Sequence, residues 1–318
     1  MKILVTPTSM QPDRRSSAID RLREFTDDIV FNPTGKPLEE DDLIPLLADC
    51  DGYIAGVDNV TAKVMDACPK LKVISRYGVG CDRVDTAAAA ARDIAVTNTP
   101  GANSEAVGEL AFALILSIAR CIPYLNETTR GGQWVRSSGI ELKGKTLGIL
   151  GLGAIGRAVA RCASGFEMKV IAYDPYMNVR YCEEHGIGNC SFDEVIERAD
   201  VISLHLPLTD ETRHMIGRDQ FEKMRDQVIL INASRGGIID EDAAYEALKS
   251  GKVFGMGLDA FETEPPAGSK LFEFSNVVAT PHTGAHTKEA TGNMANMAVD
   301  NLIDVLSGRE CRYIVNRQ

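Results

Sequence analysis

The chain has 318 residues, of which 44% are hydrophobic, 25% are charged and 6% are aromatic, and its formal net charge is −11. This composition is typical of a globular protein with room for two domains of about 150 residues each, and it excludes a chain that is disordered throughout. The acidic balance disfavours nucleic acid and anionic membranes as partners, because both repel a negatively charged surface.

Short apolar runs alternate with helical patterns through the first hundred residues. We predict helices near 16–25 and 61–67 and strands at 2–6, 53–56, 72–75 and 94–97. Strands this short and this apolar are typical of a parallel sheet that is covered by helices on both faces. The Thr-Pro-Gly sequence at 99–101 interrupts the series. After it, Asn103 or Ser104 can cap a long helix that runs to about Arg120.

A second alternating series follows and has the same character. We predict strands at 145–150, 168–173, 200–204, 227–232, 252–258 and 276–281, and then a last helix at 288–306. The two series predict an α/β protein with two Rossmann-like domains, each built on a parallel sheet. Because the last helix follows the second series, we expect it to return and pack on the first domain, which makes that domain discontinuous.

We expect neither export nor a membrane span. The longest apolar run, 110–119, is about half the length of a spanning helix, and the apolar stretch near the start of the chain is too short for a secretory signal. The eight cysteines show no CxxC spacing, so we expect reduced thiols. These features together predict a cytoplasmic protein.

A glycine motif marks the beginning of the second series. Gly151, Gly153 and Gly156 follow a predicted strand and open a predicted helix at 154–164, which is the context that a dinucleotide-binding loop requires. The N–H groups at the start of that helix can bind a pyrophosphate. Asp174 ends the next strand, where its carboxylate can accept hydrogen bonds from ribose hydroxyls and repel a 2′-phosphate. The motif therefore predicts NAD in preference to NADP.

Three side chains with complementary chemistry follow strands of the second series. Arg235, Glu264 and His282 each come shortly after a predicted strand, at the edge of the sheet where ligands bind. Hydride transfer to a 2-oxo acid needs a cation for the carboxylate, an imidazole that exchanges a proton, and a carboxylate that orients this imidazole. His185 and His214 fall in polar stretches, and we expect them to be solvated.

Seven segments resemble the D-isomer-specific 2-hydroxyacid dehydrogenases, most closely their phosphoglycerate dehydrogenase branch. They cover most of the chain in the family's order: RYGVGCDRVD (76–85), NTPGANSEAVGE (98–109), LKGKTLGILGLGAIGRAVA (142–160), YDP (173–175), INASRGGIID (231–240), GLDAFETEPP (257–266) and PHTGAHT (281–287). The resemblance implies that Arg235, Glu264 and His282 are the catalytic residues.

The resemblance also assigns contacts with ligands. It implies that the cofactor is bound by Thr99, Val107, Gly151, Gly153, Ala154, Ile155, Gly156, Asp174, His205, Pro207, Thr212, Ala233, Ser234, Asp259 and Gly284. It implies that the substrate is bound by Arg76, Val79, Gly80 and Asn103. No residue of the chain is expected to bind a metal ion.

The domain roles and the assembly follow from the same resemblance. Residues 1–100 with 287–318 correspond to a substrate domain, and residues 101–286 to an NAD-binding domain. Family members are usually homodimers joined through the nucleotide domains, and the helix at 104–120 and the segment around Trp134 match that interface. A plain buried core helix is the alternative for 104–120. Because the sequence ends at Gln318, we expect no serine regulation through a C-terminal extension.

The resemblance implies a hydride transfer between NAD and a small anionic D-2-hydroxy acid. The first substrate hypothesis is 3-phosphoglycerate, because Arg76 matches a substrate-binding arginine of that branch. Reduction of hydroxypyruvate or glyoxylate, or turnover of another anionic 2-hydroxy acid, is the alternative. A non-catalytic NAD-sensing corepressor is a hypothesis of another class, which the intact Arg, Glu and His disfavour. A zinc hydrolase is suggested only by the spacing of His282 and His286, and the Glu that should follow the first His is missing.

Overall fold

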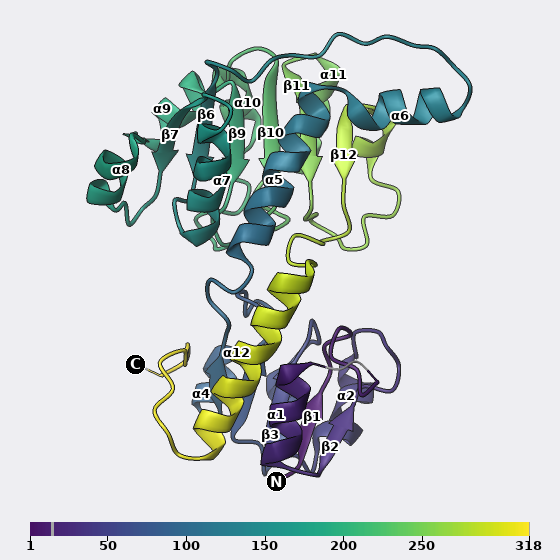
Figure 1. Ribbon diagram of the computed structural model, residues 1–318, viewed down its shortest axis with the longest axis vertical. Helices are drawn as coiled ribbons and strands as arrows, with labels where there is room; N and C mark the ends of the chain where they lie inside the picture. The colour runs from purple at the N-terminus through teal and green to yellow at the C-terminus, as the bar shows by residue number, and fades with distance from the viewer. Residues whose placement is uncertain (14–15, 318) are drawn as a thin grey trace. The chain divides into compact units, whose positions relative to one another are not determined.

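The computed structural model of the chain describes residues 1–13 and 16–317. The chain forms two compact units (Figure 1). Unit 1 comprises Met1–Asn103 and Thr287–Gln318, and unit 2 comprises Ser104–His286. The chain first passes from unit 1 to unit 2 between Asn103 and Ser104. The sequence predicted this boundary after residue 100.

Unit 1 contains a five-stranded parallel sheet with the strand order β2-β1-β3-β4-β5. Its strands are β1 (Ile3–Val5), β2 (Ile29–Phe31), β3 (Gly52–Ala55), β4 (Val73–Arg76) and β5 (Ala95–Thr97). Its first four helices are α1 (Ser17–Phe25), α2 (Glu40–Leu47), α3 (Ala62–Asp66) and α4 (Thr86–Ala90). The sequence predicted every strand of this unit except β2, whose three residues are only partly buried.

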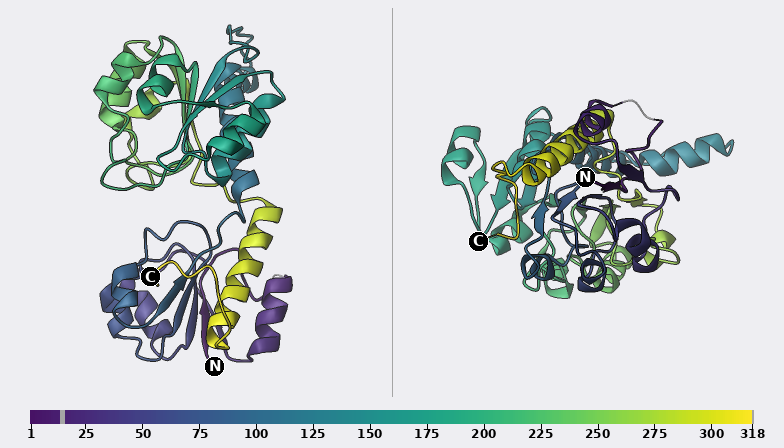
Figure 2. Two further views of the ribbon diagram at one scale, coloured as in Figure 1. Left: turned by 90° about the vertical axis from the view of Figure 1, so that its left-hand side faces the viewer. Right: turned by 90° about the horizontal axis from the view of Figure 1, so that it is seen from below.

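The last helix of the chain completes unit 1. Helix α12 (Lys288–Leu306) packs beside α1 on one face of the sheet, whereas α2, α3 and α4 cover the other face (Figure 2). The Ser75 hydroxyl on β4 donates a 2.7 Å hydrogen bond to the Ala298 carbonyl of α12. This packing confirms that the unit is discontinuous in sequence, as the order of the elements predicted.

Unit 2 contains a seven-stranded parallel sheet with the order β12-β11-β10-β9-β6-β7-β8. Its strands are β6 (Thr146–Leu150), β7 (Lys169–Tyr173), β8 (Gly188–Asn189), β9 (Val201–Leu204), β10 (Val228–Asn232), β11 (Val253–Leu258) and β12 (Val277–Ala279). The strand order reverses between the neighbours β6 and β9. This is the doubly wound topology, and its switch point is where ligands bind at the carboxyl ends of the strands.

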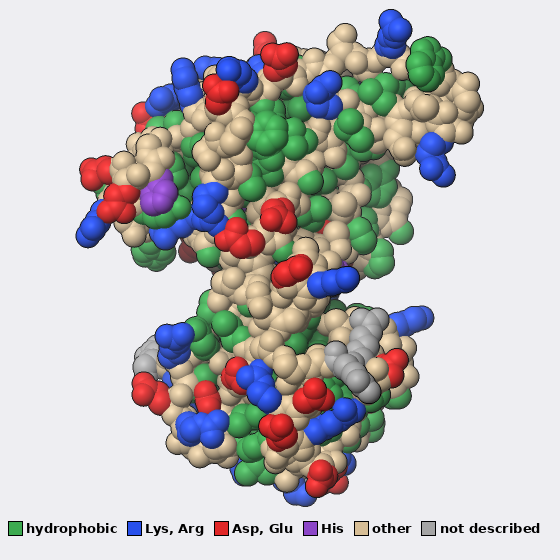
Figure 3. Space-filling model, in the orientation of Figure 1, with side chains coloured by type: hydrophobic (Ala, Val, Ile, Leu, Met, Phe, Trp, Pro, Cys, Tyr) green, Lys and Arg blue, Asp and Glu red, His purple; other side chains and the backbone are tan. Residues whose placement is uncertain are grey.

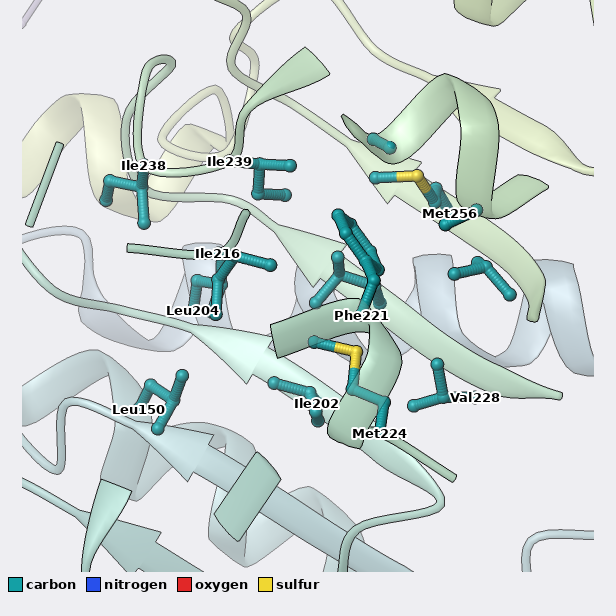
Figure 4. Packing of buried hydrophobic residues seen from close by; sticks show 14 of the residues in the cluster. Leu150, Ile202, Leu204, Ile216, Phe221, Met224, Val228, Ile238, Ile239 and Met256 are labelled. Carbon is teal, nitrogen blue, oxygen red and sulfur yellow. The ribbon is translucent and has the colours of Figure 1, made fainter. Parts of the chain in front are cut away.

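Helices cover both faces of the second sheet. They are α5 (Ser104–Ala119), α6 (Ile122–Arg130), α7 (Ala154–Ser164), α8 (Val179–His185), α9 (Phe192–Arg198), α10 (Arg218–Lys223), α11 (Glu241–Lys249) and the short 3-10 helix η1 (Lys270–Glu273). One core lies between the sheet and α5 and α7, and the other lies under α9, α10 and α11 (Figure 4). Every residue of β9 and β10 is buried, which confirms the predicted burial on both faces.

The long helix after residue 103 differs in detail from its prediction. The Asn103 side-chain oxygen is buried and has no hydrogen-bond partner, so the proposed Asn103 cap is wrong. Helix α5 ends at Ala119, and Cys121 then adopts a left-handed φ of 53° before α6, which has Pro123 in its first turn. A left-handed residue and a helix-starting proline are typical of a break between two helices.

Within the described residues, no single helix is long and apolar enough to cross a membrane. Helices α5 and α6 meet the length and composition criteria only together, as a pair that is bent by 63°.

Candidate active site

The glycine loop joins β6 to α7 at the switch point of unit 2. Gly151 has a φ of 99°, and a Cβ there would lie 2.7 Å from the carbonyl oxygen of His205 after β9. At Gly156 a Cβ would lie 2.2 Å from the Gly151 carbonyl oxygen. No heavy atom lies within 4 Å of a Cβ built on Gly153, the residue that caps α7. The helix N-terminus is therefore open to a ligand, as pyrophosphate binding requires.

Asp174 lies next to this loop, directly after β7. One carboxylate oxygen accepts a 2.8 Å hydrogen bond from the Leu152 N–H, and the other accepts a 2.8 Å bond from the Tyr176 N–H. These two bonds fix the carboxylate at the rim of the glycine loop. Since each oxygen has a further lone pair, Asp174 can also accept hydrogen bonds from the hydroxyls of a ribose. The loop and this acid together fit the adenosine half of NAD.

His205 lies on the opposite side of the switch point, at the end of β9. Its Nε2 is 2.8 Å from the Ser203 hydroxyl, whereas its Nδ1 is buried and has no hydrogen-bond partner. Burial lowers the pKa of the His205 imidazole from its ordinary 6.5 to about 4. The ring is therefore neutral near pH 7. In the same loop, the Thr212 hydroxyl donates a 2.7 Å bond to the Pro207 carbonyl.

The depressed pKa of His205 predicts a loss of stability in acid. The unfolded chain takes up this proton near pH 6.5, and the folded chain resists it down to about pH 4. The contribution of His205 to the free energy of unfolding is therefore fully present above pH 6.5. It declines as the pH falls, and by about pH 4 the free energy of unfolding is lower by about 3 kcal/mol. We expect His205→Gln to remove this part of the pH dependence of the unfolding free energy, measured by urea denaturation at several pH values. Parallel pH profiles for the two proteins would contradict the assignment.

The three predicted catalytic residues follow adjacent strands of unit 2. Arg235 lies in the turn after β10, Glu264 in the loop after β11, and His282 after β12. His282 Nδ1 lies 3.0 and 3.1 Å from the two carboxylate oxygens of Glu264, and the His282 side chain is 49% exposed. Because Nδ1 faces the carboxylate, Nε2 is the nitrogen that remains to exchange a proton with a substrate.

A buried carboxylate holds the loop that carries His282. Asp259 is only 2% exposed, and one of its oxygens accepts hydrogen bonds from the Thr280 hydroxyl at 2.6 Å and the Thr283 N–H at 2.8 Å. Its other oxygen accepts a 2.8 Å bond from the Gly284 N–H. The resemblance assigned Asp259 to the cofactor, and in the structure its carboxylate binds the backbone on the C-terminal side of His282.

The other site residues predicted in unit 2 lie close to these groups. Ala154 and Ile155 form the first turn of α7, and Ala233 is buried after β10. The Ser234 hydroxyl donates a 2.9 Å bond to the Asn232 side-chain oxygen. A Cβ built on Gly284 would lie 3.3 Å from a methyl group of Val107, so these two residues are neighbours.

The predicted substrate residues, together with Thr99, belong to unit 1. Arg76 ends β4, and its guanidinium donates hydrogen bonds to the carbonyls of Ala55 and Tyr77. Val79 and Gly80 continue the loop after β4, and Val79 is 38% exposed. The Thr99 N–H donates a 3.0 Å bond to the Gly78 carbonyl, which ties the end of β5 to the same loop. Asn103 is half-buried at the end of this unit.

Two contacts of unit 2 were not predicted. Ser203 bonds to His205, and the alternation of side chains along a strand could have revealed it, because residues two apart project from the same face. His214 is exposed, as the sequence predicted, but its Nε2 also lies 2.9 Å from Glu262 Oε1, a contact that was not predicted. No sequence pattern joins His214 and Glu262, which are 48 residues apart.

The spacing of His282 and His286 suggested a metal site as an alternative. In the described part of the chain, no three His, Cys, Asp or Glu side chains gather closely enough to hold a metal ion. His286 Nδ1 lies 3.2 Å from the Thr283 hydroxyl, and His282 faces Glu264.

The two parallel sheets, with a glycine loop at the switch point of one of them, define a dinucleotide-binding α/β protein. Residues 112–284 match the sequence model of the D-isomer specific 2-hydroxyacid dehydrogenase, NAD binding domain. The chain belongs to the D-isomer specific 2-hydroxyacid dehydrogenase family. This match confirms the family and the NAD cofactor that the sequence predicted.

Similar proteins carry several names within this family. The chain is 44% identical to a D-3-phosphoglycerate dehydrogenase of Archaeoglobus fulgidus over 99% of its own length, and it spans 59% of that relative. It is 39% identical to a glyoxylate reductase of Thermococcus litoralis, over all of this chain and 98% of the relative. A crystal structure of a protein from Thermus thermophilus superposes with a TM-score of 0.88 at 37% identity, covering 99% of this chain and 100% of that one.

Proposed function

We propose that the protein is an NAD-dependent D-2-hydroxyacid dehydrogenase that acts on a small anionic substrate. The observation that carries this proposal is the His282–Glu264 pair, which lies on the same sheet edge as the Arg235 turn in a chain with the family's NAD binding domain. When bound, NAD supplies or accepts the hydride at C2 of the substrate. The side chains of the protein supply the proton transfer and bind the substrate carboxylate.

The proton moves through His282. In the reduction, His282 gives its Nε2 proton to the C2 oxygen of a 2-oxo acid, and in the oxidation it takes that proton back. Glu264 at 3.0 Å stabilises the protonated imidazole and fixes its orientation. Arg235 binds the substrate carboxylate with its planar guanidinium. Asp259 positions His282 through the neighbouring backbone.

For the substrate, we propose 3-phosphoglycerate first. Arg76 supports this choice, since its guanidinium suits a phosphate, and so does the likeness to phosphoglycerate dehydrogenases. One observation favours glyoxylate or hydroxypyruvate as the second candidate. Val57 after β3 and Val79 after β4 are 48% and 38% exposed at the carboxyl edge of the sheet of unit 1, and apolar side chains there suit an uncharged substituent on the substrate.

A panel of 2-oxo acids tests these proposals. Oxidation of NADH is followed with phosphohydroxypyruvate, hydroxypyruvate, glyoxylate, pyruvate and a sulfonated analogue. A preference for phosphohydroxypyruvate supports the first substrate, and a preference for hydroxypyruvate or glyoxylate supports the second. Absence of turnover with every acid of the panel, together with tight NADH binding, would contradict the enzyme and favour an NAD-sensing corepressor.

We propose that unit 1 is the substrate domain, that unit 2 is the NAD-binding domain, and that two copies associate through unit 2 in the cytoplasm. Helix α6 buries none of its residues, and Trp134 is 84% exposed. Hydrophobic side chains also gather on the surface over α5 (Figure 3). The free state of all eight cysteines supports a reducing compartment. Light scattering tests the assembly, and we expect Trp134→Arg to halve the mass.

The cofactor preference is expected to depend on Asp174. Because its carboxylate would repel a 2′-phosphate, we expect Asp174→Ala to raise the activity with NADPH relative to NADH by about a hundredfold, which corresponds to almost 3 kcal/mol. The kcat/KM values for both cofactors measure this ratio, and Asp193→Ala on the exposed surface of α9 is the control. An unchanged ratio would exclude the assigned role.

A further inference from the structure

The segment that carries Glu264 is held by a second histidine–carboxylate contact outside the catalytic trio. His214 Nε2 lies 2.9 Å from Glu262 Oε1, and the His214 and Glu262 side chains are 45% and 36% exposed. Glu262 lies two residues before Glu264 in the loop after β11. His214 belongs to the loop after β9, so the contact joins loops that follow different strands of the sheet.

Glu262 also forms two hydrogen bonds with Glu241. Its N–H donates a 2.9 Å hydrogen bond to the Glu241 carboxylate at the start of α11, and its own carboxylate accepts a 3.4 Å bond from the Glu241 N–H. Burial raises the pKa of the Glu241 carboxyl, and the negative charge of Glu262 acts in the same direction. The Glu262 carboxylate is therefore in contact with Glu241 as well as with the His214 ring.

The third loop of this edge packs against the same segment. A Cβ on Gly236, which follows Arg235, would lie 1.8 Å from the Phe261 carbonyl oxygen, so the two backbones are in direct contact. The His214 N–H also donates a 2.7 Å bond to the Gly237 carbonyl. The loops after β9, β10 and β11 therefore contact one another near Glu262.

This arrangement bears on the position of the Glu264 side chain. The Phe261 N–H donates a 3.2 Å bond to Glu264 Oε1, the oxygen that lies 3.0 Å from His282 Nδ1. A displacement of the backbone at 261–262 therefore moves the carboxylate that orients the imidazole. Displacements of about 1 Å in a catalytic group can cost up to a hundredfold in rate.

We propose that His214 and Glu262 are positioning residues, whose contact fixes the segment 261–264 and thereby aims Glu264 at His282. The inference rests on the proposed function, because it assigns the two residues to the proton transfer by His282. Neither residue touches the reacting atoms in this account. Both act through the backbone of Phe261 and the carboxylate of Glu264.

The test compares Glu262→Gln and His214→Gln with His185→Ala. Both glutamine variants keep side chains that form hydrogen bonds but remove the imidazole or the carboxylate, and His185 is an exposed histidine of the same unit that stacks on Tyr181. We expect kcat to fall about tenfold in each glutamine variant, with KM for NADH nearly unchanged. We expect His185→Ala to behave as the unchanged protein does.

Two further readouts separate positioning from a general structural role. With Glu264 displaced, the protonated ring of His282 loses support, so the alkaline limb of the reduction profile should move down by about 0.5–1 pH unit. NMR titration of the histidine rings in the free protein should show the same downward shift for His282. Because both variants remove one contact, the double variant should be no worse than the worse single variant.

The possible outcomes are distinct. Wild-type turnover with unchanged pH profiles and His282 titration in Glu262→Gln would overturn the positioning role, and so would strictly additive losses in the double variant. Absence of wild-type turnover would overturn the proposed function instead. The NMR titration would then still decide whether Glu262 and His282 are coupled. Thermal unfolding of each variant verifies that the chain has folded.

Discussion

Replacing His282 with asparagine is expected to lower kcat by at least a hundredfold, because general acid–base catalysis by a positioned side chain contributes about 10²–10⁴ in rate. Asparagine is the suitable replacement for a structural reason. His282 has a φ of 50°, and asparagine tolerates this left-handed conformation better than alanine does. The variant should thus lose the imidazole with little strain in the loop. Steady-state kinetics with the best 2-oxo acid measure the loss.

The binding of NADH provides the matching control. The glycine loop and Asp174 lie at β6 and β7, whereas His282 follows β12 at the other end of the sheet order, so the dissociation constant for NADH should change less than about threefold. His286→Ala in the same loop should lose less than tenfold in kcat. Equal losses in both variants would contradict the special role of His282 and renew the case for a site that uses both histidines.

The sequence predicted best the elements whose ends are determined locally. Helices α7 and α12 have the predicted bounds, 154–164 and 288–306. The first begins directly after the glycine loop, and the second begins after Thr287, whose side chain accepts the Ala290 N–H. Such signals depend on neighbouring residues and need no knowledge of the fold.

Two of the elements without a prediction are short or exposed. Helix α6 buries none of its residues and β8 has only two residues, both exposed. Neither packs a face into the core of the unit, and β8 is too short for an alternating pattern. The break at Cys121 was also invisible, because a left-handed φ at a cysteine follows from its surroundings and not from its residue type.

In the candidate site, too, some features could be predicted from the sequence and others could not. Arg235, Glu264 and His282 could be found because each follows an apolar strand, and the carboxyl ends of parallel strands share one edge. The burial of Asp259 under the Thr283 and Gly284 amides, and the contact between His214 and Glu262, depend on loop conformations. Loops of this kind take their shape from the packing of several strands, so local sequence carries little information about them.

Replacing Arg235 with lysine is expected to lower kcat/KM for a 2-oxo acid by a hundredfold or more, which corresponds to about 3 kcal/mol. Lysine keeps the positive charge but loses the planar pair of donors that binds both oxygens of a carboxylate. The turn itself should persist. The Arg235 carbonyl accepts a 2.8 Å bond from the Asn232 side-chain amide, and the lysine ammonium can replace the guanidinium as donor to the Ser234 carbonyl.

The loss in the Arg235→Lys variant should appear mainly as a higher KM for the 2-oxo acid, with NADH binding unchanged. Arg218→Lys, at the exposed start of α10, is the matched control and should retain the wild-type KM. A second comparison isolates the carboxylate. If Arg235 binds that group, wild type and Arg235→Lys should have similar activity with an aldehyde that lacks a carboxylate. Such a substrate offers no group for the guanidinium to bind. A KM for the 2-oxo acid within about twofold of wild type in the lysine variant would mean that another cation holds the carboxylate, and Arg76 would then be the next residue to replace.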